Sequence, residues 1–276
     1  MKIRAVLMDM DGTLLGKSQV AVSRRNMAAI QKAISKGVHV IPCTGRVFDM
    51  LPPQLLTQEG LRYFVLSHGA RAYDKVEDRS LYEDLIPADE AATLMESLQG
   101  KGLYNEVAAE GTVYFEKAIT EPFDLSLIPE HHVWYVRDNC FTAVENPAEH
   151  FRKNGIGVEK MNLYNIPAGL QNELYDLVTA SGFIGHTRPG AGPHLEFSHK
   201  GLDKLCAVRS ILERIGVSFE ETMAIGDSSS DVAILEAAGL GVAMGNAPDN
   251  IKAYADVVTG LNTDDGLAAA FEAYVL

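Results

Sequence analysis

The sequence is poor in cysteine and in basic residues. Only three cysteines occur among its 276 residues, at Cys43, Cys140 and Cys206, and none belongs to a CxxC or CxxxC pair. That spacing argues against a zinc site and against a disulfide framework. Lysine and arginine together number 24 against 37 acidic residues, a formal net charge of −13. Because such a chain repels a phosphate backbone, we expect no nucleic-acid partner.

Long apolar runs and targeting signals are also missing. No stretch approaches membrane-spanning length, and the segment MKIRAVLMDMDG carries two aspartates too early for the apolar part of a signal peptide. We therefore expect a cytoplasmic protein with reduced thiols and no membrane partner. Hydrophobic residues make up 47% and charged residues 22% of the chain, a balance typical of folded proteins, and the length suits two domains. The composition does not indicate an oligomeric state.

Short apolar strands alternate with amphipathic helices at both ends of the chain. In the N-terminal part, strands are expected at 3–8, 38–43 and 63–66, with a helix beginning after Ser23. In the C-terminal part, we expect helices at 201–215, 231–238, 248–255 and 265–274, and strands at 222–225 and 241–244. This alternation predicts an α/β fold with a doubly wound, Rossmann-like parallel sheet.

The middle of the chain, 85–190, has a different character. It mixes short helical stretches (88–98, 168–181) with short strand-like ones (112–115, 132–136), and Gly, Pro and Asn separate them. We interpret it as an α+β domain inserted into a core that comprises 1–84 and 191–276.

Two aspartates follow the first predicted strand, in the segment Asp9-Met10-Asp11-Gly12-Thr13. Alternate residues at a strand end point to the same side, so the two carboxylates should repel, which tends to raise one pKa. One carboxylate can then act as a nucleophile or metal ligand and the other as a general acid. For this segment alone, an Asp-Gly hairpin turn is the competing interpretation.

Two further segments supply groups that can bind phosphate. Thr44, Gly45 and Arg46 follow the second strand, where a hydroxyl and open backbone N–H groups can hold phosphate oxygens, although a plain turn would look the same. Lys200 precedes a predicted helix and can neutralise a phosphoryl group. Lys204, one turn later, is the competing lysine.

The segment Gly226-Asp227-Ser-Ser-Ser230-Asp231 follows the strand predicted at 222–225. Two aspartates at this spacing suit a hard cation such as magnesium, which prefers carboxylate oxygens. An aspartate that caps the next helix is compatible with the same sequence.

These four segments, in this order, resemble the motifs of the haloacid dehalogenase superfamily. DMDGT is similar to the first motif, PCTGR to the second, Lys200 to the third and GDSSSD to the fourth. The run from Gly241 to Ala247, with Lys252 and Asp256 after it, resembles the Cof-type branch. That branch carries a large α+β cap, of type IIB, between the second and third motifs.

The resemblance implies a magnesium-dependent phosphatase that hydrolyses small phosphorylated metabolites, such as sugar phosphates or phosphorylated cofactors. Asp9 would attack phosphorus and form an aspartyl-phosphate, and Asp11 would serve as general acid and then as general base. The implied phosphate-binding residues are Gly12, Thr44, Gly45 and Lys200. The implied magnesium site comprises Asp9, the Asp11 carbonyl and Asp227, with Asp231 in support. Residues expected to contact the substrate are Arg46, His68, Arg188, His194, Glu196 and Asn246.

Three features depart from the Cof-type pattern, and for one of them, Val-Ala-Ile-Leu after Asp231 where Met-Leu is frequent, we expect an effect on packing alone. Ser230 stands where an asparagine is usual, and His68 stands where the loop after the third strand usually has asparagine. We expect His68 to pack against its loop, with a positive charge near the phosphate as the alternative. A phosphomannomutase-like phosphotransferase and a non-catalytic binding protein on the same fold remain competing hypotheses.

Overall fold

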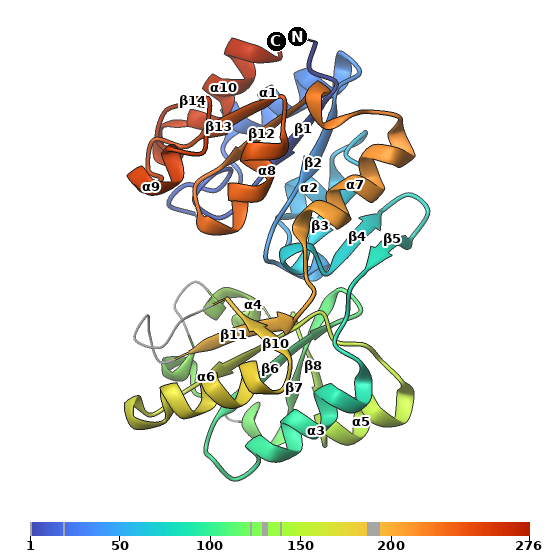
Figure 1. The fold of residues 1–276 in the computed structure, drawn as a ribbon, viewed down its shortest axis with the longest axis vertical. Helices are drawn as coiled ribbons and strands as arrows, with labels where there is room; N and C mark the ends of the chain where they lie inside the picture. Colours follow the sequence, from blue (N-terminus) through green and yellow to red (C-terminus); the bar gives the residue numbers. More distant parts are fainter. Residues whose placement is uncertain (1, 19, 122, 129–131, 139, 187–193) are drawn as a thin grey trace. The chain divides into compact units, whose positions relative to one another are not determined.

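The computed structural model describes residues 2–18, 20–121, 123–128, 132–138, 140–186 and 194–276. The chain divides into two compact units. The first comprises the residues up to Arg46, Leu51–Glu83 and Asp203–Leu276, and the second comprises Val47–Met50 and Asp84–Leu202. Both chain ends, blue and red in Figure 1, thus belong to the first unit.

A five-stranded parallel sheet forms the centre of the first unit, which confirms the predicted α/β fold. Its strand order is β14-β13-β12-β1-β2. The strands are β1 (Ala5–Met8), β2 (His39–Pro42), β12 (Thr222–Gly226), β13 (Leu240–Ala243) and β14 (Val257–Val258). The accompanying helices are α1 (Arg24–Ser35), α2 (Pro53–Thr57), α7 (Lys204–Ile215), α8 (Val232–Ala237), α9 (Asp249–Lys252) and α10 (Gly266–Tyr274). Apolar residues fill β1 because a parallel sheet covered by helices is buried on both faces.

The strand register brings the predicted motifs together. Met8, the last residue of β1, pairs with Ile225 on β12 and with Pro42 on β2. The segments that follow these three strands therefore start side by side, at the edge of the sheet where open α/β folds bind ligands.

A small antiparallel sheet continues this unit. It contains β3 (Tyr63–Leu66), β4 (Arg71–Asp74) and β5 (Arg79–Glu83). A parallel bridge between Cys43 and Val65 joins β3 to the chain just after β2. The loop after β3 thereby lies beside the loop after β2.

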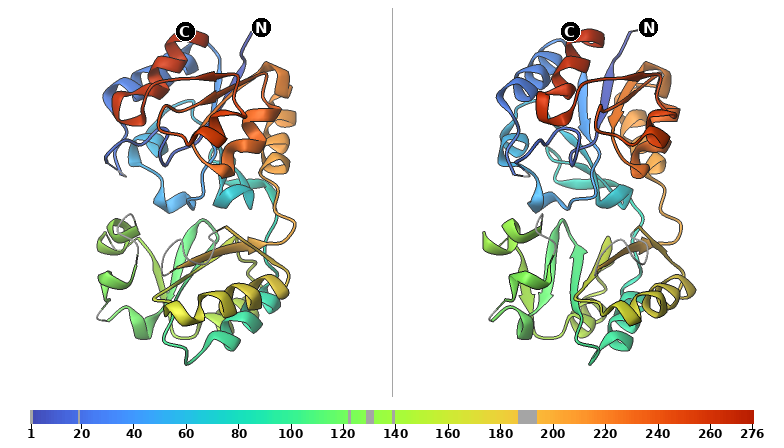
Figure 2. Two further views of the ribbon diagram at one scale, coloured as in Figure 1. Left: turned by 60° about the vertical axis from the view of Figure 1, so that its left-hand side comes forward. Right: turned by 90° about the vertical axis from the view of Figure 1, so that its left-hand side faces the viewer.

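The second unit is an α+β domain built on a six-stranded sheet of order β10-β11-β9-β6-β7-β8 (Figure 2). Its strands are β6 (Tyr104–Ala109), β7 (Thr112–Glu116), β8 (Thr142–Val144), β9 (Lys160–Tyr164), β10 (Phe183–Gly185) and β11 (Leu195–His199). One face packs against α3 (Ala88–Leu98), α5 (Pro147–Asn154) and α6 (Gln171–Ala180). The other face packs against α4 (Val133–Arg137).

Two features of this unit differ from the sequence expectations. The stretch 132–136 was expected to be a strand because of its valines and aromatics, but 133–137 is helical. Helical winding buries Tyr135 and lets its hydroxyl donate to Glu106 on β6, a tertiary contact that overrides β-propensity. The chain also returns to the first unit at Asp203 rather than at 191, because β11 pairs with β9 of the second unit.

Candidate active site

Asp9 and Asp11 follow β1 directly. The Asp9 side chain is buried, and its backbone N–H donates to the Ile225 carbonyl at 2.9 Å, which fixes it beside the end of β12. The side chain of Asp11 is half exposed. Gly12 has a φ of +83°, and a Cβ there would lie 2.3 Å from Asp227 Oδ2. Glycine at this position therefore allows the first aspartate loop to approach the Asp227 carboxylate closely.

Asp227 and Asp231 form the second acidic pair of the site. Asp231 is fully buried, and its Oδ2 accepts hydrogen bonds from the N–H groups of Asp227 (3.2 Å) and Ser228 (3.1 Å). Asp231 thus shapes the loop that presents the partly exposed Asp227 carboxylate. Ser230, the departure from the family pattern, shares a hydrogen bond with the Ser228 hydroxyl at 2.9 Å.

Lys204 is the lysine that contacts these carboxylates. It begins α7, and its buried ammonium donates to Asp231 Oδ1 at 2.9 Å. The sequence ranking of Lys200 over Lys204 needs correction on this point. Lys200 is exposed and belongs to the second unit. Lys204 lies four residues later, at the start of α7, and its side chain lies in the buried acidic cluster.

Burial and mutual repulsion make the ionised carboxylates of this cluster energetically unfavourable. Burial, followed by the charge of Asp231, raises the pKa of Asp9 well above its usual range. The same two causes raise the pKa of Asp227 to about 6. Burial by itself would lower the pKa of Lys204, but the charges of Asp231 and Asp9 outweigh it and raise that pKa. One lysine therefore balances only part of the negative charge.

The donor set fits a divalent cation. Carboxylate oxygens of Asp9, Asp227 and Asp231 all lie within 4.8 Å of one another. Hard cations prefer such oxygens, and a bound cation would offset the charge that Lys204 leaves unbalanced. Asp231 is fully buried and already accepts the Lys204 ammonium and two backbone N–H groups, whereas Asp227 is partly exposed, so Asp9 and Asp227 are the better ligands and Asp231 the better support.

The pKa of Asp227 predicts how stability depends on pH without metal. Between pH 3.8 and about 6 the folded protein retains a proton that the unfolded chain has lost, so stability falls as pH rises through this window. In EDTA, the free energy of unfolding of Asp227→Asn should therefore rise relative to wild type as pH rises across this window, by on the order of 1 kcal/mol after solvent screening, and its Tm should rise with it. Thermal melts of both proteins at several pH values measure this. A Tm difference independent of pH would contradict it.

Thr44, Gly45 and Arg46 form the loop after β2. Thr44 is fully buried, and its hydroxyl accepts the N–H of Arg46 at 3.1 Å. The Arg46 guanidinium binds Asp11 through both oxygens, at 2.9 Å from Nε and 2.5 Å from Nη2. The structure thus places Arg46 on Asp11, a partner that the sequence did not reveal.

His68 belongs to a short 3-10 turn, Ser67–Gly69, that lies against the Thr44 loop. Its N–H donates to the Thr44 carbonyl at 3.0 Å, and a Cβ on Gly45 would lie 2.4 Å from the ring Cε1. The φ of His68 is +59°, a left-handed conformation that costs energy for a residue with a side chain. Its imidazole therefore packs directly on the loop that carries Thr44 and Arg46.

Two further polar side chains complete the acidic loops. Asn246 Nδ2 donates to the Gly12 carbonyl at 2.8 Å and lies 3.3 Å from Asp227 Oδ2. Thr13 donates through its hydroxyl to Asp227 Oδ1 at 3.1 Å. The motif alone does not reveal this role of Thr13, although a hydroxyl next to two aspartates is a recognisable signal.

The remaining sequence-based candidates lie in the second unit or outside the described residues. Glu196 on β11 pairs with the ammonium of Lys160 on β9. His194 is half-buried next to β11, near the Tyr164 ring. Arg188 lies outside the described residues.

Cys43 is a further nucleophilic residue whose thiol interacts with the charges of Asp231 and Asp9. Burial raises the pKa of its thiol to about 12, so it stays protonated at neutral pH. A cysteine nucleophile is therefore a poor alternative to Asp9.

In the part of the chain that the structure describes, no helix is long and apolar enough to span a bilayer.

Comparison with known proteins agrees with this architecture. Residues 6–271 match the family model of haloacid dehalogenase-like hydrolases. The chain is 30% identical to a 5-amino-6-(5-phospho-D-ribitylamino)uracil phosphatase of Bacillus subtilis (99% of this chain, 96% of the relative). It is 29% identical to a pyridoxal phosphate phosphatase of Escherichia coli, over 97% of each chain. A haloacid dehalogenase-like hydrolase from Bacteroides thetaiotaomicron superposes with a TM-score of 0.81 at 24% identity, covering 99% of both chains. The chain therefore belongs to the haloacid dehalogenase-like hydrolase family and is an enzyme of its phosphatase type.

Proposed function

We propose that this enzyme is a magnesium-dependent phosphatase that hydrolyses small phosphorylated metabolites through an aspartyl-phosphate on Asp9. The observation that carries the proposal is the buried Asp9 carboxylate, held among Asp227, Asp231 and Lys204 at the end of β1. An isolated carboxylate in such a place would be costly, so its retention favours a chemical role.

In the proposed reaction, Asp9 attacks phosphorus and displaces the alcohol of the substrate. The covalent intermediate divides a very slow hydrolysis into two easier steps. Lys204 would neutralise charge on the phosphoryl oxygens, and the Thr44 loop would bind them. Magnesium, when bound by Asp9, Asp227 and the Asp11 carbonyl with support from Asp231, would offset the charge of the phosphoryl group and the carboxylates.

Asp11 would donate a proton to the leaving oxygen and later take one from the attacking water. Its carboxylate is now held on both oxygens by Arg46, an arrangement that requires the charged form. The ion pair must therefore open before Asp11 can act as an acid. Guanidinium groups also bind phosphate on two oxygens, so an incoming substrate offers Arg46 a second partner and would release Asp11.

The named activities of the relatives direct the choice of substrates. One acts on a phosphorylated ribitylamino-uracil and another on pyridoxal phosphate, so we propose phosphorylated cofactors, their precursors and sugar phosphates for this enzyme.

The three free thiols, Cys43, Cys140 and Cys206, are compatible with a cytoplasmic location.

Phosphate release from these compounds, with magnesium and with EDTA, tests the proposal. We expect turnover of at least one compound that falls by at least about 100-fold in EDTA and returns with added magnesium. Release that is indifferent to EDTA would contradict the metal requirement. Transfer only in the presence of a sugar bisphosphate activator would favour the mutase hypothesis instead.

A further inference from the structure

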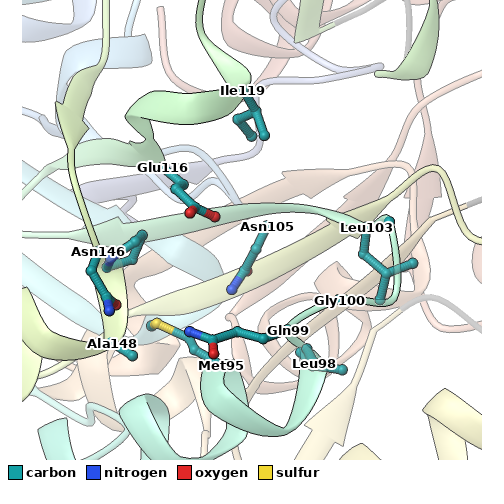
Figure 3. A pocket seen from close by; sticks show the side chains of 12 residues that line it. Met95, Leu98, Gln99, Gly100, Leu103, Asn105, Glu116, Ile119, Asn146 and Ala148 are labelled. Atoms are coloured by element: carbon teal, nitrogen blue, oxygen red, sulfur yellow. The ribbon is translucent and has the colours of Figure 1, made fainter.

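The second unit contains a pocket of about 380 Å³ that is separate from the acidic cluster of the first unit (Figure 3). Four polar side chains line it from different places: Gln99 after α3, Asn105 on β6, Glu116 on β7 and Asn146 before α5. Figure 3 shows Gln99, Asn105 and Glu116 directed toward a common space. The volume lies within the range of small-molecule sites.

Asn105 is a polar residue on an apolar face. Side chains alternate along β6, so Asn105 shares its face with Val107 and Ala109, which belong to the hydrophobic core under α3, α5 and α6. Its Oδ1 is buried and has no hydrogen-bond partner in the parts of the chain that the structure describes. Burying a carbonyl without a hydrogen-bond partner is unfavourable, so a donor from a ligand would stabilise it here.

Glu116 lies opposite Asn105 when the register of β6 and β7 is continued by two residues. Val107 pairs with Tyr114 across β6 and β7, and Tyr114 also belongs to that core. Two residues farther along each strand, Asn105 and Glu116 thus share the core-facing side at the end of the sheet. The pocket consequently combines an unsatisfied carbonyl with a carboxylate.

The charges around the pocket favour a cation. Among the described residues that line it, Glu116 is the one ionisable side chain. The C-terminus of α3, the negative end of that helix, borders it at Leu98 and Gln99. The N-terminus of α5 borders it too, but Pro147 has no N–H there, and Asn146 Oδ1 already accepts the N–H of Glu149 at 3.2 Å. The described lining residues include no lysine, arginine or histidine that could bind a phosphate group.

Apolar side chains supply the rest of the lining. Met95, Leu98, Leu103 and Ile119 border the pocket and can cover a short hydrocarbon chain. We propose that this pocket binds a small amino alcohol. Its ammonium group and its hydroxyl would donate hydrogen bonds to the Glu116 carboxylate and to Asn105 Oδ1. Such a ligand would differ in charge from the phosphorylated substrate, so the pocket would be a binding site distinct from the acidic cluster.

The test uses the full-length protein and three probes of one length: 4-amino-1-butanol, 1,4-butanediol and 4-hydroxybutyrate. NMR titration and thermal melts should show binding of the amino alcohol with a dissociation constant on the order of 1 mM, and at least about tenfold weaker binding of the other two. Perturbed amides should include those of Asn105 and Glu116. Equal effects of all three probes, or no effect of the amine, would overturn the proposal.

Two variants and a control make the result specific. Glu116→Gln should weaken the amine about tenfold, and Asn105→Leu should abolish its binding while raising the Tm of the free protein by about 2–4 °C, because the unsatisfied carbonyl is removed. Glu173→Gln, at an exposed position on α6, should change neither property. Amine binding that survives both pocket variants would place the ligand elsewhere and refute the assignment.

Discussion

Asp9→Asn is expected to lower phosphate release by at least about 10⁴-fold, because an amide cannot form the covalent intermediate. The same substitution should raise the Tm of the metal-free protein. Burial and the neighbouring Asp231 make the ionised Asp9 carboxylate costly, and asparagine removes that charge without changing the shape of the side chain. A variant that is inactive yet more stable separates loss of chemistry from loss of fold.

Asp249→Asn is the matched control. Asp249 is fully exposed at the start of α9, so its replacement should leave both the rate and the Tm near those of wild type. Steady-state kinetics with magnesium measure the rate. Calorimetry in EDTA measures the Tm of the metal-free protein. Substantial phosphate release by Asp9→Asn would eliminate Asp9 as the nucleophile.

Lys204→Met is expected to impair both stability and activity. The substitution leaves Asp231 buried without its cation, which typically costs about 3–5 kcal/mol when one partner of a buried pair is removed. It also removes the lysine whose charge acts on Asp9, so kcat/KM should fall by about 10²–10³-fold in the protein that remains folded.

Lys200→Met is the matched control for Lys204→Met, because it removes the other lysine that the sequence offered for this role. Lys200 is exposed, so its loss should change the free energy of unfolding by less than about 0.5 kcal/mol and kcat/KM by only a few-fold. Urea unfolding and substrate kinetics of both variants decide between the two lysines. If Lys200→Met were the more damaging variant for catalysis, the original ranking from the sequence would be restored.

The parallel sheet and its motifs could be predicted because local signals agree there. The apolar run before Asp9 became β1, Ser23 caps α1 through its hydroxyl, and β3 covers 63–66 as expected. Strand ends in a parallel sheet meet at one edge, so the aspartate segments were expected to converge, and the register of β1 with β12 brings them together.

Tertiary contacts decided the features that the sequence did not reveal. The choice between Lys200 and Lys204 depends on where α7 begins, and a boundary that differs by one turn changes which ammonium is buried. Residues 133–137 have strand-like composition but are helical, because Tyr135 reaches Glu106 from a distant strand. The pairing of Arg46 with Asp11 likewise joins two loops that are remote in sequence.

Mass spectrometry of Asp11→Asn, quenched during turnover of p-nitrophenyl phosphate, tests the central claim most directly. This leaving group departs without a proton, so Asp9 can still be phosphorylated, while the missing base slows hydrolysis of the intermediate. We predict one phosphoryl group on the peptide that contains Asp9, and none when Asp9→Asn is added. Phosphate release in wild type with no phosphoryl group trapped on Asp9 would contradict the mechanism.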